Sequence, residues 1–355
     1  MIETGAPEAR HWQNYLAAFR PVLDLERLKE ERILVTGGSG FIGTNIVEFY
    51  RNWIAGALIN FDIVPPRNPE HASLWRKVDI CDRVDLARAI AEFRPTAVFH
   101  MAARADLIGR TADDYPENSE GVRNLMRALR ELPHRPKIIV ASSRLVCNLH
   151  HIPVSDTDYS APNAYGLSKV QTEIVTRQEG GNSIPWILVR PTGIWGPWFG
   201  VPYRNFFEMI RRGLYLHPRG HATLKSYGFV GNTVFELDRL MYGAGKRINE
   251  TSYVCDPVVD VYDWARMIAK QLNVRAPFQV PYSLLYLAAK AGDLLEKLGM
   301  RHAPLTSFRL DNLTTNMVVD FMLAAPATGP LPFSLGDATA ITCSWLDTGD
   351  AESRR

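Results

Sequence analysis

The feature that most constrains this chain is a turn rich in glycine inside residues 33–62. An apolar run leads into the sequence Thr-Gly-Gly-Ser-Gly-Phe-Ile-Gly at residues 36–43, and a helix-like segment, a second apolar run and an acid follow. Gly37 allows a tight turn after the first strand, Gly40 lets a pyrophosphate approach the backbone, and Gly43 permits close packing of helix on strand. This order predicts a dinucleotide-binding unit rather than an ordinary turn.

Composition limits the partners that the chain can have. It has 355 residues, of which 46% are hydrophobic, and a net charge of +2 with basic and acidic residues interspersed. We therefore predict neither a nucleic-acid surface nor a basic membrane patch. The four cysteines lack C-x-x-C spacing, no signal-peptide pattern is present, and charged residues interrupt the most apolar segment. We expect a cytoplasmic protein with a small-molecule substrate and no metal, membrane or nucleic-acid partner.

Strand and helix patterns alternate through residues 32–192, which we assign as an NAD-binding domain. The alternation predicts a doubly wound Rossmann-type parallel sheet with helices on both faces, and a cofactor at the carboxyl ends of the strands. The patterns predict these helices and strands: helices at 84–93, 118–131 and 164–177, and strands at 78–80, 97–103, 137–140 and 186–189.

Residues 193–347 form a smaller, mostly helical substrate-binding lobe in this prediction. Strands around Phe229 and Tyr253 are expected to return to the main sheet. Residues 282–298 read as an amphipathic helix whose apolar stripe comprises Leu284, Leu287, Ala288, Ala291, Leu295 and Leu298. Residues 1–31 are predicted to be an N-terminal extension on the outside of the domain, and residues 348–355 a polar tail.

Ser143, Tyr165 and Lys169 are the candidate catalytic residues. Tyr165 and Lys169 are four residues apart, so they lie one turn apart on the same face of a helix. A tyrosine is a poor base at neutral pH, and a neighbouring lysine cation favours its phenolate form. Ser143 follows a predicted strand and can hydrogen-bond the same substrate oxygen. Taken alone, the spacing of Tyr165 and Lys169 fits any amphipathic helix. Because it follows a nucleotide-binding unit here, we interpret the two residues as a catalytic pair.

These motifs together resemble the extended branch of the short-chain dehydrogenase/reductase superfamily, which contains the NAD-dependent nucleotide-sugar epimerases and dehydratases. The resemblance covers about residues 32–200. Its motifs are the glycine turn, Asp62, Asp79-Ile80, His100 to Ala103, Asn118 with Gly121 and Asn124, Ser142-Ser143, Tyr165 to Lys169, Arg190-Pro191 and Gly196-Pro197. His100 could also be an acid or base, but a histidine that ends a buried strand is more often a hydrogen-bonded core group.

The resemblance implies that Tyr165 is the acid/base, that Lys169 lowers its pKa and holds the nicotinamide ribose, and that Ser143 orients the substrate. Asp62 would bind the adenosine ribose and favour NAD over NADP, although Arg67 weakens that preference. The cofactor-binding residues that it implies are Gly37, Gly40, Phe41, Ile42, Gly43, Asp62, Asp79, Ile80, Met101, Ala102, Ala103, Asn118, Ser142, Tyr165, Lys169, Arg190 and Pro191.

The chain departs from the family pattern in its substrate half. Arg144 and Leu145 follow the serine, so the acid pair of the sugar 4,6-dehydratases is missing. Gly193 stands where many epimerases have a substrate-contacting asparagine, and Lys225 replaces the usual arginine. The residues that we expect to contact substrate, including cations for a diphosphate, are Arg144, Gly193, Arg204, Arg219 and Lys225.

Three functions are compatible with these motifs. The leading one is an NAD-dependent C4 epimerase of a nucleotide-activated sugar, acting through a transient 4-keto intermediate. The first alternative is a dehydrogenase or reductase of a keto-sugar or a hydrophobic alcohol of steroid or flavonoid type, in which the aromatic residues within 195–207 line a pocket instead of packing the lobe. The second is a non-catalytic NAD-binding scaffold. The resemblance also implies a homodimer built from the helices at about 118–131 and 165–178.

Overall fold

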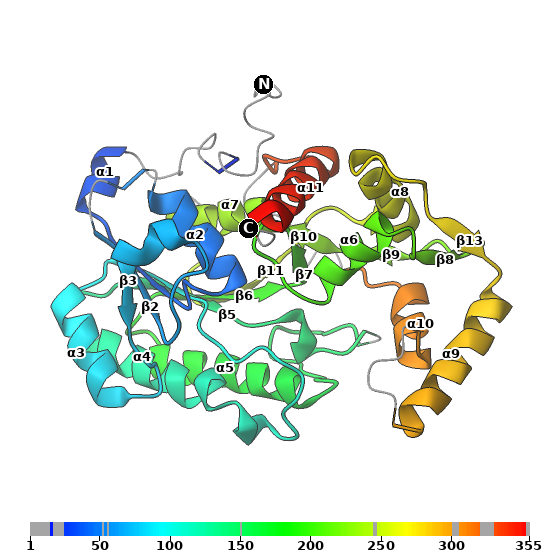
Figure 1. Ribbon diagram of the computed structural model, residues 1–355. Coiled ribbons are helices and arrows are strands. Elements are labelled where there is room, and N and C mark those ends of the chain that lie inside the picture. The colour runs from blue at the N-terminus through cyan, green and yellow to red at the C-terminus, as the bar shows by residue number, and fades with distance from the viewer. Residues whose placement is uncertain are drawn as a thin grey trace.

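A seven-stranded parallel sheet forms the centre of the molecule (Figure 1). The computed structural model describes residues 15–16, 25–51, 53–54, 57–149, 151–243, 247–299, 305–319 and 330–352. The strands lie in the order β11-β6-β5-β4-β1-β2-β3. Their bounds are Arg32–Thr36 (β1), Ala57–Asp62 (β2), Trp75–Lys77 (β3), Ala97–His100 (β4), Lys137–Ala141 (β5), Trp186–Pro191 (β6) and Glu250–Val254 (β11).

Successive side chains of β1 point to opposite faces of this sheet and enter two separate cores. Ile33 and Val35 join the core on one face, and Leu34 joins the core on the other. Figure 1 shows α2 (Phe41–Arg51) and α7 (Val230–Tyr242) on the first face. The second face is covered by α3 (Arg83–Phe93), α4 (Glu120–Arg130) and α5 (Ala164–Gly180). From β1 the sheet continues through β2 and β3 on one side and through β4, β5 and β6 on the other. The topological switch point, where the strand order reverses, therefore lies between β1 and β4.

The predicted fold class is confirmed, and the three predicted helices form close to their expected bounds. Side-chain caps explain two of their starts: Asp82 accepts hydrogen bonds from the first turn of α3, and Asn163 accepts one from Gly166 N at the start of α5. The strand predicted at 78–80 is wrong. The chain pairs with β2 earlier, at Trp75–Lys77, where the Trp75 indole also donates to Asp62 O.

The remaining residues form the lobe through short strand pairs and helices. β7 (Gly193–Trp195) pairs with β10 (Tyr227–Phe229), β8 (Leu216–Pro218) with β13 (Phe278–Val280), and β9 (Leu224–Lys225) with β12 (Val259–Asp260). The other α-helices are α1 (Leu25–Glu30), α6 (Tyr203–Arg211), α8 (Val261–Gln271), α9 (Tyr282–Lys297), α10 (Ser307–Thr314) and α11 (Leu335–Glu352). Short 3-10 turns are Pro69–Leu74, Ala112–Asp114, Pro116–Asn118 and Arg144–Val146.

One of the two predicted returns to the main sheet occurs. Tyr253 lies in β11, which pairs with β6 at the edge of the sheet. Phe229 instead ends β10, which pairs with β7 outside the main sheet, and the next residue begins α7. The expectation for Phe229 was therefore wrong.

The N-terminal segment contributes to the core, contrary to the prediction of an outer extension. Tyr15 and Leu16 are buried, and the Tyr15 hydroxyl donates to Asn45 Oδ1 at 2.6 Å. The Tyr15 ring packs between Phe229 and Phe333, with ring centroids 5.7 and 5.6 Å away. The other residues of the segment up to position 24 lie outside the described residues. At the other end, α11 continues to Glu352, through most of the predicted polar tail.

Candidate active site

The glycine turn joins β1 to α2 at the carboxyl edge of the sheet. Gly37 has a φ of +72°, and a Cβ there would lie 2.4 Å from Ala102 N. A Cβ on Gly43 would lie 2.1 Å from Gly37 O. At Gly40 the only close atom is Gly37 O, at 3.1 Å, so its outer side is open. Phe41 and Ile42 follow at the N-terminus of α2. A tight turn that exposes backbone at a helix N-terminus fits the pyrophosphate of a dinucleotide.

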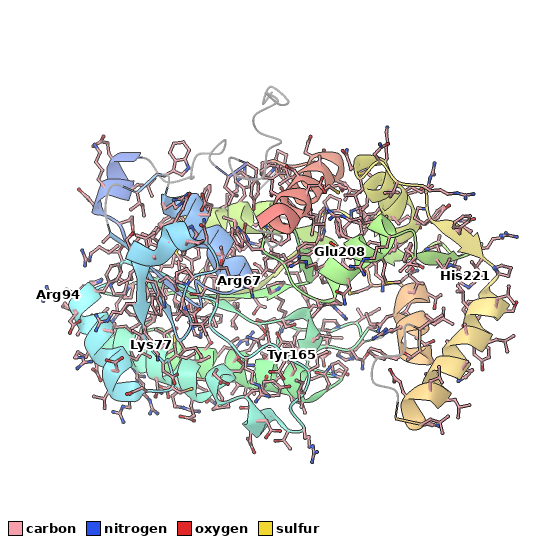
Figure 2. All side chains as sticks on the ribbon, viewed as in Figure 1. Arg67, Lys77, Arg94, Tyr165, Glu208 and His221 are labelled. Carbon is pink, nitrogen blue, oxygen red and sulfur yellow. The ribbon has the colours of Figure 1, made fainter. Side chains whose placement is uncertain are left out.

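Asp62 lies beside this turn at the end of β2. Its carboxylate accepts hydrogen bonds from Ser39 N at 3.0 Å and from Val64 N at 3.1 Å. Arg67 crosses the same turn, donating from Nε to Ser39 O at 3.1 Å and from Nη1 to Trp198 O at 2.8 Å (Figure 2). Backbone carbonyls therefore hold the Arg67 guanidinium, and Asp62 offers a carboxylate where a ribose diol fits.

Asn118 holds the loop that follows β4 and contains Met101, Ala102 and Ala103. Its side chain pairs with the backbone of Arg104 in both directions, each at 3.0 Å. Its amide also donates to Ser168 Oγ on α5 at 2.8 Å. All of these contacts are within the protein, so we interpret Asn118 as a residue that positions the loop under the cofactor. His100 is a core group as expected, hydrogen-bonded to Thr36 at 2.6 Å, and burial lowers its pKa to about 3.

Ser143, Tyr165 and Lys169 meet where β5 ends and α5 begins. Ser143 follows β5, and its hydroxyl lies close enough to the Tyr165 phenol to influence the pKa of that group. Lys169 lies one turn further along α5 and donates from Nζ to Ala141 O at 2.9 Å. The edge of the Tyr115 ring packs against the Tyr165 ring, with centroids 6.1 Å apart. The structure therefore brings together the three predicted catalytic side chains.

The pKa of Tyr165 is raised and not lowered as predicted. Burial raises the pKa of this phenol to about 12, and the neighbouring Ser143 hydroxyl opposes the shift only in part. Burial also lowers the pKa of Lys169 to about 8, opposed by the charge of Glu173. The helix spacing of Tyr165 and Lys169 carries no information about how far each group is buried, so this rise could not be predicted from the sequence.

Glu173, one turn beyond Lys169, organises a buried network that the sequence reasoning missed. It is fully buried and accepts two hydrogen bonds from the Arg190 guanidinium, at 2.8 and 2.9 Å. It also accepts from Ser142 Oγ at 2.6 Å, from the Tyr159 hydroxyl and from Arg177. The repeat of four residues from Tyr165 to Lys169 to Glu173 was the available signal.

This network corrects the cofactor-binding roles expected for Ser142 and Arg190. Arg190 is 1% exposed, and its guanidinium reaches Glu173, Asp156 O and the Tyr253 hydroxyl. Ser142, just after β5, and Arg190 of β6 both bind Glu173, and they thereby fasten α5 to these two strands near Lys169. Ile80 is likewise turned into the core against Gly121, and Asp79 accepts from the Cys81 backbone.

Arg144 and Lys225, two of the cations predicted to contact substrate, lie within electrostatic reach of each other. Arg144 follows Ser143 and is half-buried, and its guanidinium lies within electrostatic reach of Tyr203 and Tyr253. Lys225 is 5% exposed and donates from Nζ to Asn312 O at 3.0 Å. Burial and the charge of Arg144 lower the pKa of Lys225 to about 8. The two side chains thus form a basic region, and its Arg144 directly follows Ser143 in the chain.

Gly193 makes room for a tyrosine. A Cβ on Gly193 would lie 1.9 Å from the hydroxyl oxygen of Tyr203. The Tyr203 ring packs edge-on against Tyr227 at 5.3 Å between centroids, and burial raises the Tyr203 pKa to about 12. The Tyr203 hydroxyl therefore occupies the space of a side chain at position 193. From the sequence, Tyr203 was recognised only as one of the lobe's aromatic residues.

Arg204 and Arg219 do not join these cations. The Arg204 guanidinium lies over the Trp345 ring, 5.7 Å from its centroid. Arg219 follows β8 and donates from its backbone to Val280 O. It is two residues from His221, which Figure 2 shows at one end of the molecule, well away from Tyr165. The aromatic residues Trp195, Phe199 and Phe207 are at most 2% exposed, so they pack the lobe.

Comparison with known proteins agrees with this geometry. A sequence model of the NAD dependent epimerase/dehydratase family matches residues 33–268. The chain is 27% identical to the N-acetyl-alpha-D-glucosaminyl-diphospho-ditrans,octacis-undecaprenol 4-epimerase of Escherichia coli O157:H7, over 79% of this chain and 84% of that protein. It is 30% identical to the 3-beta-hydroxysteroid dehydrogenase of Mycolicibacterium neoaurum, over 51% of this chain and 52% of that protein.

Solved structures show the same fold. The UDP-glucose 4-epimerase of Thermotoga maritima with UDP-glucose has a TM-score of 0.67 at 20% identity, covering 90% of this chain and 99% of that one. The UDP-glucose 4-epimerase of Thermus thermophilus in complex with NAD has a TM-score of 0.65 at 20% identity, covering 89% and 99%. The parallel sheet and its helices are thus those of known epimerase structures.

Proposed function

The chain belongs to the NAD dependent epimerase/dehydratase family, and from that premise we propose that it is a C4 epimerase acting on a sugar carried by a diphosphate. NAD, when bound, would supply the hydride acceptor and donor that epimerisation at C4 needs. The glycine turn and Asp62 would hold its pyrophosphate and adenosine ribose, and Lys169 its nicotinamide ribose.

The contact between Ser143 and Tyr165 is the observation that carries this proposal. Tyr165 exchanges a proton with the hydroxyl at the carbon that is oxidised and reduced, and Ser143 orients that oxygen. Lys169 lies one helical turn from Tyr165, and its Nζ donates to Ala141 O. This bond keeps the lysine cation beside the reacting groups. The presence of all three side chains in one place argues against a non-catalytic scaffold.

Arg144 favours epimerisation over dehydration. A sugar dehydratase needs an acid and a base beside the serine to eliminate water, and the residues after Ser143 are Arg144 and Leu145. Arg144 adds a positive charge in their place. With Lys225 it offers two cations to a substrate diphosphate.

The group that carries the sugar diphosphate can be a nucleoside or a polyprenol. One relative is named for a sugar on a diphospho-undecaprenol, and one solved neighbour holds UDP-glucose. A sugar diphosphate is common to both. We therefore propose a sugar linked through diphosphate to a nucleoside or a polyprenol, with the nucleotide form as our first expectation.

A dehydrogenase or reductase is the second candidate, favoured by the 30% identity to a 3-beta-hydroxysteroid dehydrogenase. It would act on a keto-sugar or a hydrophobic alcohol. The burial of Trp195, Phe199 and Phe207 counts against it, because these rings pack against one another and not around a pocket.

The test is incubation of the purified protein with NAD and candidate sugar diphosphates, with proton NMR of the sugar and absorbance of the reduced nicotinamide recorded together. An epimerase converts the sugar at C4 without net reduction of NAD. A dehydrogenase accumulates reduced nicotinamide in proportion to substrate. Absence of conversion of both nucleoside and polyprenyl sugar diphosphates would contradict the proposal.

A further inference from the structure

The apolar stripe predicted for α9 is present, but it faces solvent. Leu284, Leu287, Leu294, Leu295 and Leu298 are 40–75% exposed. The side of α9 that is buried is a different one. It is made of Leu285, Ala289 and Gly292, and it packs on Leu310 of α10. Figure 1 shows α9 at the outer edge of the molecule. An exposed apolar face of this size marks an interaction surface.

The four charges of α9 divide between its sides: Lys290 and Lys297 border the stripe, and Asp293 and Glu296 lie toward the side that packs on α10. Lys290 and Lys297 each follow a leucine of the stripe by three residues, so both lie along its border. Asp293 is turned away from it, because its carboxylate accepts from the backbone and hydroxyl of Ser307 on α10, at 2.9 and 2.6 Å. The positive border of an apolar stripe is complementary to an anionic lipid surface.

Aromatic side chains extend this surface. Tyr282 and Tyr286 on α9 are exposed, with the Lys290 ammonium 5.3 Å from the Tyr286 ring centroid. Phe308 on α10 is 72% exposed. Tyrosine and lysine are residues that settle at the boundary between lipid and water, because each combines an apolar body with a polar end.

We propose that α9 lies flat on the surface of a membrane that contains anionic phospholipid. The helix would bury its leucine stripe at the boundary of headgroups and acyl chains, with Lys290 and Lys297 at the level of the phosphates. A flat helix agrees with its length of 16 residues, since a span needs about 20. Among the described residues, none of the helices is long and apolar enough to cross a membrane. The proposal revises our expectation that the protein has no membrane partner.

The proposed membrane surface is connected to the substrate side of the site. α9 packs on α10, and Asn312 O of α10 accepts the hydrogen bond from Lys225. The backbone of Met317, just beyond α10, also pairs with Leu224 and Ser226 on either side of Lys225. Docking through α9 would therefore place a substrate cation close to the lipid surface. The membrane proposal itself does not depend on which reaction the protein performs.

Sedimentation with vesicles tests this proposal on the full chain. We expect wild type to pellet with vesicles of phosphatidylcholine and phosphatidylglycerol, and more weakly with phosphatidylcholine alone. Leu287→Glu and Leu298→Glu each lower the affinity by about tenfold or more, because a leucine that enters the lipid is replaced by an acid. Val84→Glu on α3 is the matched control: Val84 is 78% exposed, and this variant binds as wild type does.

A second variant separates charge from apolar burial. Lys290→Gln combined with Lys297→Gln removes the preference for phosphatidylglycerol and keeps the thermal unfolding temperature, because both side chains are exposed. Wild type that stays in the supernatant with both vesicle types would overturn the proposal. So would equal binding by Leu287→Glu, or a dimer in the absence of lipid that Leu287→Glu dissociates, because the stripe would then be covered by a second copy.

Discussion

Tyr165 is the residue on which the proposed chemistry depends, because it would exchange the proton of the substrate hydroxyl beside Ser143. Tyr165→Phe removes the hydroxyl and keeps the ring that packs on Tyr115. We expect turnover to fall by about 10²–10⁴-fold with NAD affinity unchanged within a factor of about three. Steady-state kinetics and calorimetry with NAD measure the two effects. Tyr282→Phe, an exposed tyrosine on α9, is the control, and equal turnover in the two variants would contradict the assignment.

Gly193 and Tyr203 form a coupled pair. Gly193→Ala forces the Tyr203 hydroxyl to move, because the new Cβ would lie 1.9 Å from it. We expect kcat/KM to fall by about a hundredfold through displacement of groups around the substrate. Tyr203→Phe in the same chain should recover part of that loss, since the clashing oxygen is gone. A double-mutant cycle measures the coupling, and purely additive effects would show that the contact is unimportant.

We expect Asp62 to decide between the two nicotinamide cofactors. Its carboxylate lies beside the glycine turn, and Arg67 donates to Ser39 O and Trp198 O. We expect NAD to bind more tightly than NADP, and Asp62→Asn to weaken NAD binding by about tenfold. Calorimetry with both cofactors checks this. Tighter binding of NADP by wild type would show that Arg67 leaves its carbonyl partners to hold a phosphate.

At the scale of elements, the junction of β10, α7 and β11 carries a half-buried acid, Asp256. The Asp256 carboxylate accepts from Phe229 N and Asn232 Nδ2, each at 3.1 Å. Its other oxygen is buried without a hydrogen-bond partner among the described residues. Burial raises the pKa of Asp256 to about 7, despite the two hydrogen bonds.

Because of this raised pKa, the free energy of unfolding decreases as the pH rises. The native state holds a proton on Asp256 that the unfolded chain releases near pH 4, so stability falls as pH rises from about 4 through 7. The unfolding free energy therefore differs between pH 4 and pH 7. We expect Asp256→Asn to reduce that difference by on the order of 3 kcal/mol. Urea unfolding at both pH values measures it. Asp113→Asn, at an exposed position, is the control and should change nothing.

The elements were predictable where local spacing decides them. The glycine turn, β1, α2 and the pairing of Tyr165 with Lys169 follow from contacts a few residues apart in sequence. The role of Arg190 was not predictable, because it depends on Glu173 in another element and on complete burial of both groups. The orientation of α9 was missed for the same reason: the stripe is visible in the sequence, but which face meets α10 is decided by Leu310 and Ser307.

For the whole molecule, the chain ends and the lobe were hardest to predict. Tyr15 is buried because Asn45, Phe229 and Phe333 surround it, and these come from three distant parts of the chain. Arg219 resembled a substrate cation in sequence but lies with β8 and β13 away from Tyr165. Long-range packing places such residues, and periodicity carries no information about it.

The homodimer expected through α4 and α5 can be stated more sharply. The apolar residues of α4 are buried in the chain's own core, so the outward side chains are Glu120, Arg123, Arg127 and Arg130, and the three arginines all reach Glu179. A two-fold dimer would bring this positive surface against itself. We expect a homodimer that becomes tighter as salt screens that repulsion. Analytical ultracentrifugation at low and high salt measures this, and a monomer at every salt concentration would contradict it.

The central claim is that one site removes and returns the same hydride at sugar C4. The direct test uses a sugar diphosphate deuterated at C4, incubated with the protein and NAD in ordinary water. We predict that the C4 epimer forms with its deuterium retained and without accumulation of reduced nicotinamide. Loss of the deuterium to solvent, or one reduced nicotinamide for each substrate consumed, would contradict the account.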